Sequence, residues 1–509
     1  GATNITQGNS GGSGANAGSV VITTDSGAVI TTGALSAGVV GESIGGGGGR
    51  SGVAMNLSIL STIPNNQTSQ SVAYLGSSGG GAGGGGSVSI NQTGSISTQG
   101  YQSEALYAGS VGGGGGSAGT FDANLTYGSK TINLTIGGQQ GSAGNAGSVT
   151  ITNNGDISTA GPYSHGINAQ AVGGGGGNGS ILHSQEYGGG IVEGVMSLGS
   201  NSTDNNTSGE GGDISLYVGT TSATPTVQAG SFTIQTTGYG STAIFGQSVG
   251  GGGGQAASGL ISSQFNNDIV GGPQLSLGTG IAVDFISLTF SVQTGSSTSA
   301  TSASVTSPCS STAAGDTCNS SYKYGSAAAI TLGGFNANSN QEAGAVTINN
   351  FAALTTSSAM SDAIKLQSIG GGGGYGTFVD VYSGSPFGAA STYLGGGSNS
   401  GDGASITATN GGAIVTEQAG SLGMLAQSIG GGGGDARTLS IAYDQGLFSG
   451  FTASLGNQSG GGVGTGGAVT ITNNGAIQSS GTGSDGIVAQ SIGGGGGHSE
   501  SYGSGISPA

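Results

Sequence analysis

Short runs in which apolar and polar residues alternate recur along the whole chain. One run is Val149-Thr150-Ile151-Thr152, and related runs begin at Val88, Val346 and Val469. Strict alternation of β-branched and polar residues predicts a strand with one buried face. A turn such as Asn153-Asn154-Gly155 follows, because Asn and Gly tolerate the positive φ angles of tight turns. Each run therefore predicts a half-buried strand that ends in a turn.

Further elements complete a repeating unit. A second short strand places an aliphatic residue two positions after the turn glycine, at Ile96, Ile157, Ile414 and Ile477, with Val29 equivalent. It leads into a segment with the order small, aliphatic, variable, usually small, usually Gln, small and β-branched, followed by five glycines. Two more alternating stretches come after the glycines. No segment keeps a 3.6-residue apolar period with caps, so the unit is predicted to hold about five strands and no helix.

The five-glycine runs mark the period of the chain. They begin at Gly45, Gly112, Gly173, Gly250, Gly370, Gly430 and Gly493, at intervals of 67, 61, 77, 120, 60 and 63 residues. The interval of 120 suggests one unit whose marker was lost. A flexible linker need not keep its length in seven copies, and no Lys-Ser/Thr follows the runs to complete a phosphate-binding loop. We therefore expect the runs to form a column without side chains, which serves either as an internal packing seam or as an edge for self-association.

The high glycine content is interpreted differently once the repeat is recognised. Glycine makes up 119 of 509 residues, about 23%, which in an aperiodic chain would suggest low complexity. The formal net charge is −17, with only 5 Lys and Arg. Nucleic acid is therefore excluded as a partner, and so is direct binding to anionic membranes.

The repeat predicts an all-β fold. Units that cannot bury their apolar faces alone are stabilised by stacking, as in solenoids. We interpret residues 1–509 as a single repeat array, an elongated β-solenoid of about seven to eight repeats of ~60 residues. Coils of roughly 20–25 residues stacked about 4.8 Å apart would give a rod on the order of 100 Å, although the number of coils per unit stays open.

Residues 291–327 form an insertion rich in Ser, Thr and Ala. It contains both cysteines of the chain, Cys309 and Cys318. Their close spacing predicts a local disulfide and hence an oxidising compartment, with a pair of free thiols as the alternative.

The repeat resembles a known family. Gln-Ser-Ile followed by five glycines, at residues 427–434 and 490–497 with variants at the other runs, is similar to repeats in large autotransporter passengers of Gram-negative bacteria, as is the preceding Thr-Asn-Asn-Gly turn. The resemblance implies an extracellular β-helical stalk, tethered to the outer membrane or released, that is often adhesive or self-associating, as in a biofilm. It also implies a membrane connection only through a translocator domain that this sequence lacks. We expect a processed passenger or a segment of a longer chain.

Catalytic chemistry finds little support in the sequence. Arg50 and Arg437 lie in different units, and His165, His183 and His498 share no motif. Polysaccharide cleavage needs clustered carboxylates, and tandem calcium-binding repeats are absent. The sequence therefore predicts no enzyme and no catalytic, cofactor-binding or metal-binding residue.

The function favoured by the sequence is a structural extracellular stalk or fibre, adhesive or self-associating. Its expected partners are other copies, head to tail or side by side, or the continuation of a longer chain, with a host or surface glycan as a further possibility. The alternative is a ligand-binding solenoid that recognises glycan or ice through Thr-x-Thr strands such as Thr150 and Thr152. Because threonine also suits the polar face of a half-buried strand, the structural function is preferred. A polysaccharide-cleaving β-helix ranks lower still.

Overall fold

The computed structural model describes most of the repeat array. Its described residues are 3–7, 14–58, 69–75, 83–124, 130–136, 144–186, 191–198, 209–220, 232–263, 275–277, 281–283, 325–332, 341–383, 388–394, 401–442, 449–455 and 464–505. All regular elements within these ranges are strands, β1 to β37. Within the same ranges, no helix has the length and apolarity needed to cross a membrane.

Each repeat forms one coil, and successive strands of a coil join different sheets among five parallel sheets of seven strands. We number the sheets I to V in the order in which a coil visits them. Sheet I contains β2 (Val20–Thr24), β7 (Val88–Gln92), β12 (Val149–Asn153), β17 (Ile214–Val218), β24 (Val346–Asn350), β29 (Ile406–Asn410) and β34 (Val469–Asn473). Sheet II contains β3 (Val29–Thr31), β8 (Ile96–Thr98), β13 (Ile157–Thr159), β18 (Thr233–Thr236), β25 (Ala353–Thr356), β30 (Ile414–Thr416) and β35 (Ile477–Ser479). Sheet III contains β4 (Val39–Ile44), β9 (Leu106–Val111), β14 (Ile167–Val172), β19 (Ile244–Val249), β26 (Ile364–Ile369), β31 (Met424–Ile429) and β36 (Ile487–Ile492).

The last two sheets follow the glycine runs. Sheet IV contains β5 (Gly48–Ser58), β10 (Gly115–Asn124), β15 (Gly176–Glu186), β20 (Gly253–Ser263), β27 (Gly373–Ser383), β32 (Gly433–Ala442) and β37 (Gly496–Gly505). Sheet V contains β1 (Thr3–Gln7), β6 (Ser69–Leu75), β11 (Lys130–Ile136), β16 (Ile191–Leu198), β23 (Gly325–Leu332), β28 (Gly388–Leu394) and β33 (Ser449–Leu455). Coils 1 to 7 are numbered from β2 onward.

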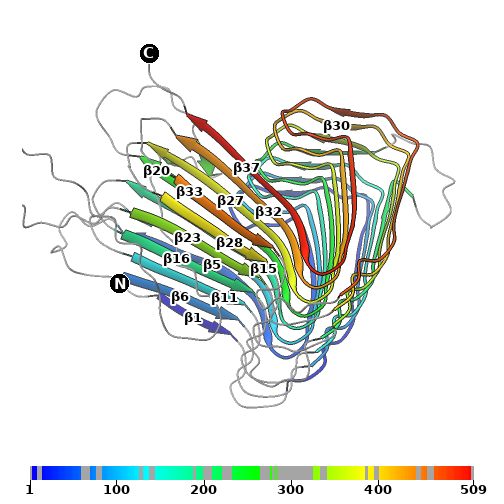
Figure 1. Cartoon of the computed structure of the whole chain (residues 1–509), viewed down its shortest axis with the longest axis horizontal. Helices are drawn as coiled ribbons and strands as arrows, with labels where there is room; N and C mark the ends of the chain where they lie inside the picture. The colour runs from blue at the N-terminus through cyan, green and yellow to red at the C-terminus, as the bar shows by residue number, and fades with distance from the viewer. Residues whose placement is uncertain are drawn as a thin grey trace, which may run out of the picture.

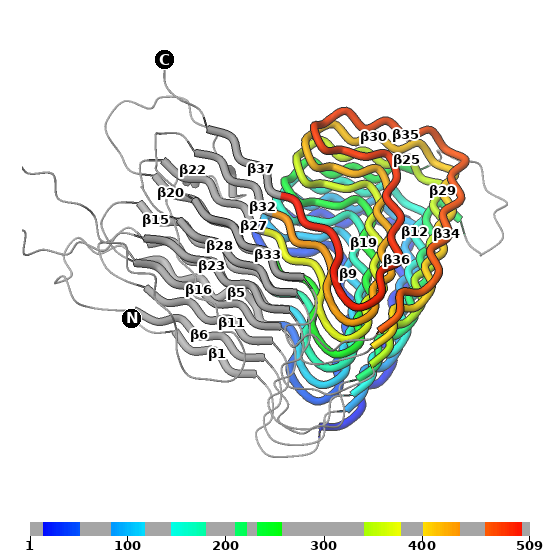
Figure 2. The backbone as a smooth tube through the Cα atoms, in the orientation of Figure 1, coloured from blue at the N-terminus to red at the C-terminus, as the bar shows by residue number. Residues whose placement is uncertain are grey.

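Figure 1 shows two parts in every coil. Sheets I, II and III wind around a closed, roughly triangular section, which Figure 2 traces as a stack of coloured loops. The strands of sheets IV and V project from this section, outward and back (Figure 1). The two strands of one excursion belong to different sheets, so they do not form a hairpin with each other.

The predicted all-β solenoid is confirmed, but the predicted coil size is wrong. Equivalent strands of consecutive repeats are direct neighbours, for example Val88 with Val149 and Ile96 with Ile157. One repeat of ~60 residues is therefore one coil. The strands of sheets IV and V belong to this same coil, so they do not lengthen the solenoid along its axis. Seven coils stack to about 30 Å, not 100 Å, at ~4.8 Å per strand spacing.

The long glycine interval is also explained. β19 pairs directly with β26, and β20 with β27, so no coil lies between them. The extra residues instead form a long connection from β20 to β23, which includes the antiparallel pair β21 (Leu275–Leu277) and β22 (Ile281–Val283). The suggestion of a unit with a lost marker is therefore wrong. Cys309, Cys318 and most of the 291–327 insertion lie outside the described residues.

Alternating strands build the core as predicted. In β12, Val149 and Ile151 are fully buried while Thr150 and Thr152 are half-exposed. The buried residues of sheets I, II and III meet inside the triangular section, where Ile157 and Ile167 belong to the same cluster. Each inner aliphatic residue is covered above and below by its equivalents, which is how the repeats stabilise one another.

The turns differ from the prediction. Asn154 and Gly155 are not among the residues with positive φ. Asn153 instead donates from Nδ2 to the carbonyl of Gly155 at 2.9 Å, and a Cβ at Gly155 would overlap the carbonyl oxygen of Gly94 in the preceding coil. Glycine is needed there for close stacking. The left-handed residue lies at the next corner, where Tyr163 has a φ of 53°.

A serine ladder runs along this second corner through all seven coils. The backbone amide of each serine donates to the hydroxyl of the next, for example from Ser164 to Ser241 at 2.9 Å and from Ser241 to Ser361 at 3.1 Å. The hydroxyl of Ser241 in turn donates to the carbonyl of Gly161 in the preceding coil at 3.0 Å. Each serine thus satisfies one donor and one acceptor of the buried backbone. The members are Ser36, Ser103, Ser164, Ser241, Ser361, Ser421 and Ser484.

We predict that Ser241→Ala lowers the free energy of unfolding by about 1–3 kcal/mol, because it leaves a buried amide and a buried carbonyl unpaired. Thermal or urea unfolding followed by circular dichroism measures the loss. Ser158→Ala is the matched control, since Ser158 is exposed on sheet II of the same region. Equal midpoints for both variants would show that the ladder contributes nothing.

Candidate functional site

The seven glycine runs stack in one column where sheet III passes into sheet IV. Their later residues pair in register, as Gly115 does with Gly176 and Gly176 with Gly253. The amide of Gly175 donates to the carbonyl of Gly112 in the preceding coil at 2.7 Å, a bond that recurs in the other coils. The second to fifth glycines have φ between 78° and 148°, a region that disfavours any residue with a Cβ. The five inner runs are buried.

Backbone contact between coils explains why side chains are absent here. A Cβ on Gly115 would overlap the carbonyl oxygen of Gly176 in the next coil. A Cβ on Gly173, the first residue of its run, would overlap the carbonyl of Glu210. The geometry is that of a packed seam, while a role in self-association stays a prediction.

The Gln and Ser that precede the glycines face opposite sides of sheet III. Gln367 donates from Nε2 to Oε1 of Gln427 at 2.9 Å, and Gln427 donates to Gln490 at 2.7 Å. Ser428 donates to the carbonyl of Ala404 and accepts from the amide of Gly467, both at 2.7 Å. The glutamines thus form a ladder on the side of sheet IV, and the serines fasten sheet III to the link before sheet I.

A polar layer fills the angle between sheets III and IV. We call the residue directly after each glycine run the post-glycine residue, and the residue two before each sheet III strand the corner residue. The post-glycine residues are Arg50, Ser117, Asn178, Gln255, Tyr375, Asp435 and His498, and the corner residues are Ala37, Glu104, His165, Thr242, Asp362, Leu422 and Asp485. From coil 2 onward, each post-glycine side chain makes at least one contact with a side chain of the preceding coil.

Two pairs illustrate this overlap. Asn178 donates from Nδ2 to Oε1 of Glu104 at 2.8 Å, from coil 3 to coil 2. Gln255 in coil 4 contacts His165 in coil 3 and accepts from Asn168 at 2.9 Å. The corner and post-glycine side chains of adjacent coils therefore form one continuous contact.

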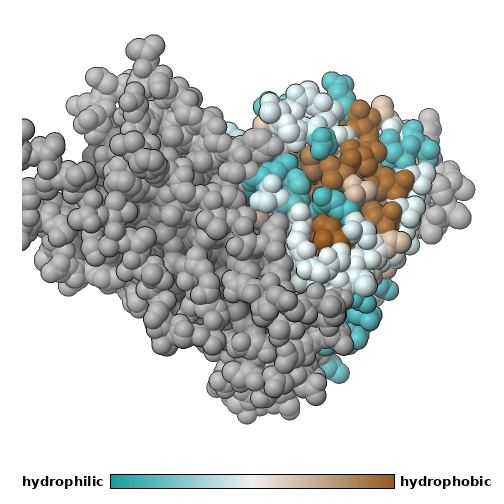
Figure 3. All heavy atoms as spheres, viewed as in Figure 1, coloured by the Kyte–Doolittle hydropathy of each residue, from teal (hydrophilic) through white to brown (hydrophobic). Residues whose placement is uncertain are grey.

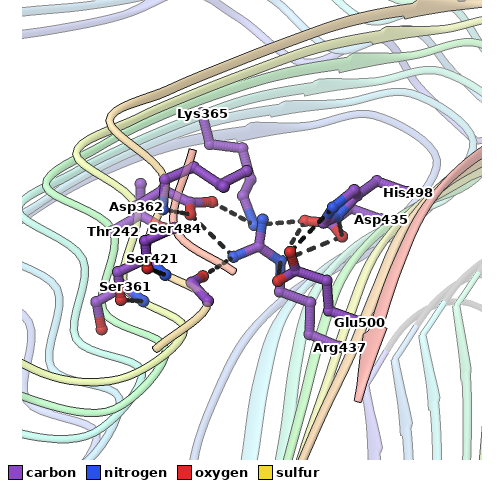
Figure 4. A network of polar contacts seen from close by, with 12 residues as sticks. Thr242, Ser361, Asp362, Lys365, Ser421, Asp435, Arg437, Ser484, His498 and Glu500 are labelled. Carbon is purple, nitrogen blue, oxygen red and sulfur yellow. Dashed lines mark hydrogen bonds and ion pairs between the residues drawn. The ribbon is translucent and has the colours of Figure 1, made fainter. Parts of the chain in front are cut away.

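The layer contains an ion-pair network across coils 5, 6 and 7, drawn in Figure 4. Lys365 lies 2.6 Å from Asp435 and 3.0 Å from Asp362, and its Nζ lies 3.6 Å from the centroid of the Tyr375 ring. Arg437 lies 2.9 Å from each of the same two carboxylates. The side chains of these four ionic residues are fully buried. Two of the five Lys and Arg residues in the chain are thus used here.

Two residues of coil 7 complete the network. His498 Nδ1 lies 3.0 Å from Asp435, and its Nε2 lies 3.1 Å from Glu500 (Figure 4). Their side chains are 18% and 13% exposed. With His498 protonated, three cations face three carboxylates, so the network is neutral as a whole. Balance of this kind is what a buried group of charges requires.

The electrostatics agree with this pairing. Burial raises the pKa of Asp435, but Arg437 and Lys365 outweigh it and hold that pKa well below its usual value. Burial lowers the pKa of His498, but hydrogen bonds to Asp435 and Glu500 outweigh it and raise the pKa to about 9. These pKa shifts keep Asp435 negative and His498 positive at neutral pH.

His165 behaves in the opposite way. Burial, and then the nearby Lys365, lower the pKa of His165 to about 3. Its Nδ1 accepts from the amide of Thr242 at 2.9 Å, and its ring stacks on Phe245. It is a neutral packing residue. The side chain of His183 lies outside the described part of the chain.

The structure brings together residues that the sequence interpretation kept apart. Arg437 lies in a different unit from Arg50, and the histidines share no motif, yet Asp435 contacts both Arg437 and His498. Asp362, Lys365, Asp435 and Glu500 were missed altogether. The available signal was positional, because Asp435 and His498 both directly follow a glycine run and must stack if one repeat is one coil.

The polar outer face of sheet I does not carry a continuous column of threonines. Thr347, Thr407 and Thr470 stack in register, but the column is occupied by Ser215 in coil 4, beside Tyr217. The threonine array is therefore interrupted.

Among the residues whose placement is described, no group of three or more His, Cys, Asp and Glu side chains could hold a metal ion. No family model matches the chain, and the comparisons with curated proteins and with solved structures also found no match. By its fold, the chain is a repeat protein with a β-helix-like solenoid.

We predict that Gly115→Ala destabilises the protein more than Gly496→Ala does. Both positions have a φ of 134°, so both variants carry a similar backbone strain of about 1–3 kcal/mol. Only Gly115 is covered by a further coil, whereas the nearest atom to a Cβ at Gly496 is a side-chain carbon of Ile492 at 3.7 Å. Thermal unfolding in dilute solution compares them. An equal loss in both variants would exclude backbone packing between coils as the reason for glycine.

A pH dependence is expected from His498. Its pKa of about 9 in the folded protein exceeds the unfolded value of about 6.5. The stabilisation, at most about 3 kcal/mol, is therefore complete below pH ~6.5 and is lost as the pH rises through ~9. Asp435, Glu500 and Arg437 are the charged groups that face the imidazole.

The variant His498→Asn tests this expectation. Its unfolding midpoint should lie well below that of the unchanged protein at pH 6 and approach it at pH 10. A difference that is constant from pH 6 to pH 10 would show that His498 is not charged in the folded state.

Proposed function

We propose that this protein is a structural extracellular β-solenoid that acts as a stalk or fibre, adhesive or self-associating and without catalytic activity. The observation that carries the proposal is the use of the polar side chains. The serine ladder, the glutamine ladder and the ion pairs of Lys365 with Asp435 and of Arg437 with Asp362 join one coil to the next at buried positions, so these polar groups stabilise the array. The resemblance of the Gln-Ser-Ile-Gly repeats to autotransporter passengers supports a location on the bacterial cell surface, tethered to the outer membrane or released, and a role in adhesion or biofilm.

Two alternatives are less favoured. A glycan-binding or ice-binding surface would be expected to use an unbroken array, and the threonine column on sheet I is interrupted by Ser215. Polysaccharide cleavage needs carboxylates that a sugar can reach. Of the three carboxylates in the charged network, Asp362 and Asp435 are fully buried and Glu500 is only 13% exposed.

Surface labelling tests the proposal. Antibodies raised against the folded chain should label the outside of intact producing cells, on projecting or released material seen by negative-stain electron microscopy. Label that appears only after the cells are lysed would contradict an extracellular function. Release of reducing sugar from a panel of polysaccharides, abolished by Asp435→Asn in a folded variant, would contradict a structural function.

A further inference from the structure

Lys365 and Asp435 form the shortest ion pair of the charged network. Nζ of Lys365 lies 2.6 Å from Oδ2 of Asp435, and both side chains are fully buried. Lys365 belongs to β26 in coil 5 and Asp435 to β32 in coil 6, and each of these strands is paired on both sides. The contact therefore lies inside the array, at the boundary between two coils. A buried primary amine against a carboxyl group is also the pair of reactants from which an amide forms.

We propose that Lys365 and Asp435 condense into an intramolecular amide bond, which cross-links coil 5 to coil 6. The bond forms between Nζ of Lys365 and Cγ of Asp435, and one water molecule leaves. The ion pair in the structure is the form that precedes the reaction. The inference does not depend on the proposed structural function, because it follows from the contacts of the pair alone.

Apolar groups surround the amine. On sheet III, Lys365 stacks between Phe245 of coil 4 and Leu425 of coil 6, both fully buried. Its Nζ lies 3.6 Å from the centroid of the Tyr375 ring. The next residue of the strand, Leu366, belongs to the apolar core, which Figure 3 shows at the coil 7 end as hydrophobic residues ringed by hydrophilic ones. These groups keep water from the amine, and a desolvated lysine is an activated nucleophile.

The carboxyl group of Asp435 is polarised for attack. Its Oδ1 accepts from Nε of Arg437 at 3.2 Å and lies 3.0 Å from Nδ1 of His498. Two cationic donors on this oxygen stabilise the negative charge that develops there when the amine adds to Cγ. Because Cγ is bonded to Oδ2, which already contacts Nζ, the reacting atoms are held close together before the reaction.

Asp362 supplies the proton acceptor. Its Oδ2 lies 3.0 Å from Nζ of Lys365, while its Oδ1 accepts from the amide of Leu422 at 2.8 Å. Of the three protons on the ammonium group, one stays on the amide nitrogen and two leave with Oδ2 of Asp435 as water. One of these two passes directly to Oδ2. The other passes through Asp362, which ends as a carboxylate again.

Condensation removes two buried charges, which are costly to keep in the interior. Burial and Arg437 lower the pKa of Lys365, but the carboxylates beside it outweigh both and raise that pKa, so the ions are the resting form and the reaction is slower than folding. Reactants held in contact reach effective concentrations on the order of 10⁵ M or more, which favours the amide. The remaining charges stay balanced. Arg437 keeps Asp362 at 2.9 Å, and His498 keeps Glu500 at 3.1 Å.

Mass spectrometry of the folded, purified chain tests the cross-link. After prolonged incubation at neutral pH under reducing conditions, we expect the intact mass to lie one water molecule below the mass of the sequence. Chymotryptic digestion should then yield a branched peptide in which Lys365 is joined to Asp435. The peptide is needed because ring closure between Asp402 and Gly403 would also release one water.

Three variants identify the reacting groups. Lys365→Arg keeps the positive charge but has no primary amine, so it should retain its full mass. Asp362→Asn keeps both reactants but removes the proton acceptor, so the bond should form more slowly by about tenfold or more. Glu417→Gln is the matched control, because it neutralises an exposed carboxylate of coil 6 and should react like the unchanged chain. Circular dichroism confirms that each variant is folded.

A folded, unchanged chain that keeps its full mass overturns the proposal, and so does a branched peptide that joins Lys365 to Asp362. Equal rates for Asp362→Asn and Glu417→Gln would exclude Asp362 as the proton acceptor. None of these results decides the structural function, which surface labelling on cells tests. Conversely, label found only inside cells would contradict the extracellular function and leave the cross-link unaffected.

Discussion

In-register stacking of the coils is the constraint on which the rest of the structure depends. Each coil is displaced from the next by one strand spacing, about 4.8 Å. Every side chain therefore lies against its own equivalent above and below, and a position accepts only residue types that can neighbour themselves at that distance. Aliphatic side chains, hydroxyls and amides meet this condition. Glycine meets it where backbones touch, as at Gly115. The low charge of the chain follows, because an ion cannot stack on an identical ion.

The same constraint explains how much could be predicted. The alternation of Val149 and Ile151 with threonines was sufficient to predict the buried face of sheet I, because burial in a strand depends on local period alone. The turn chemistry could not be predicted from Asn154 and Gly155, because Gly155 is required by contact with Gly94, a residue of another coil. The prediction of the coil size was wrong for a related reason. Nothing in the local pattern indicates whether the two strands after the glycines belong to the same coil or begin a new one.

The charged network was beyond prediction for a different reason. The partners of Asp435 and Arg437 in the preceding coil, Lys365 and Asp362, are 70 and 75 residues away, so these contacts cannot be recognised until the coil length is known. Once repeats are aligned on the glycine runs, Asp435 and His498 fall in one column. The contacts of Asp435 with Lys365 and of Arg437 with Asp362 still depend on the overlap between sheets III and IV, which brings a sheet IV side chain onto the coil before it. That overlap is a property of the three-dimensional winding.

Columns of identical residues stabilise the stacking of coils, whereas the buried charged residues determine which coil lies next to which. Ser241 would bond equally well to the equivalent serine of any coil, so the serine ladder stabilises stacking without selecting a neighbour. Lys365 and Arg437, by contrast, each need the carboxylates of Asp362 and Asp435, because a buried ion without its partner costs several kcal/mol. Coils 5, 6 and 7 can therefore stack in only one order at no such cost. A repeat protein needs this distinction, since repeats that are interchangeable in every column can pair out of sequence while they fold.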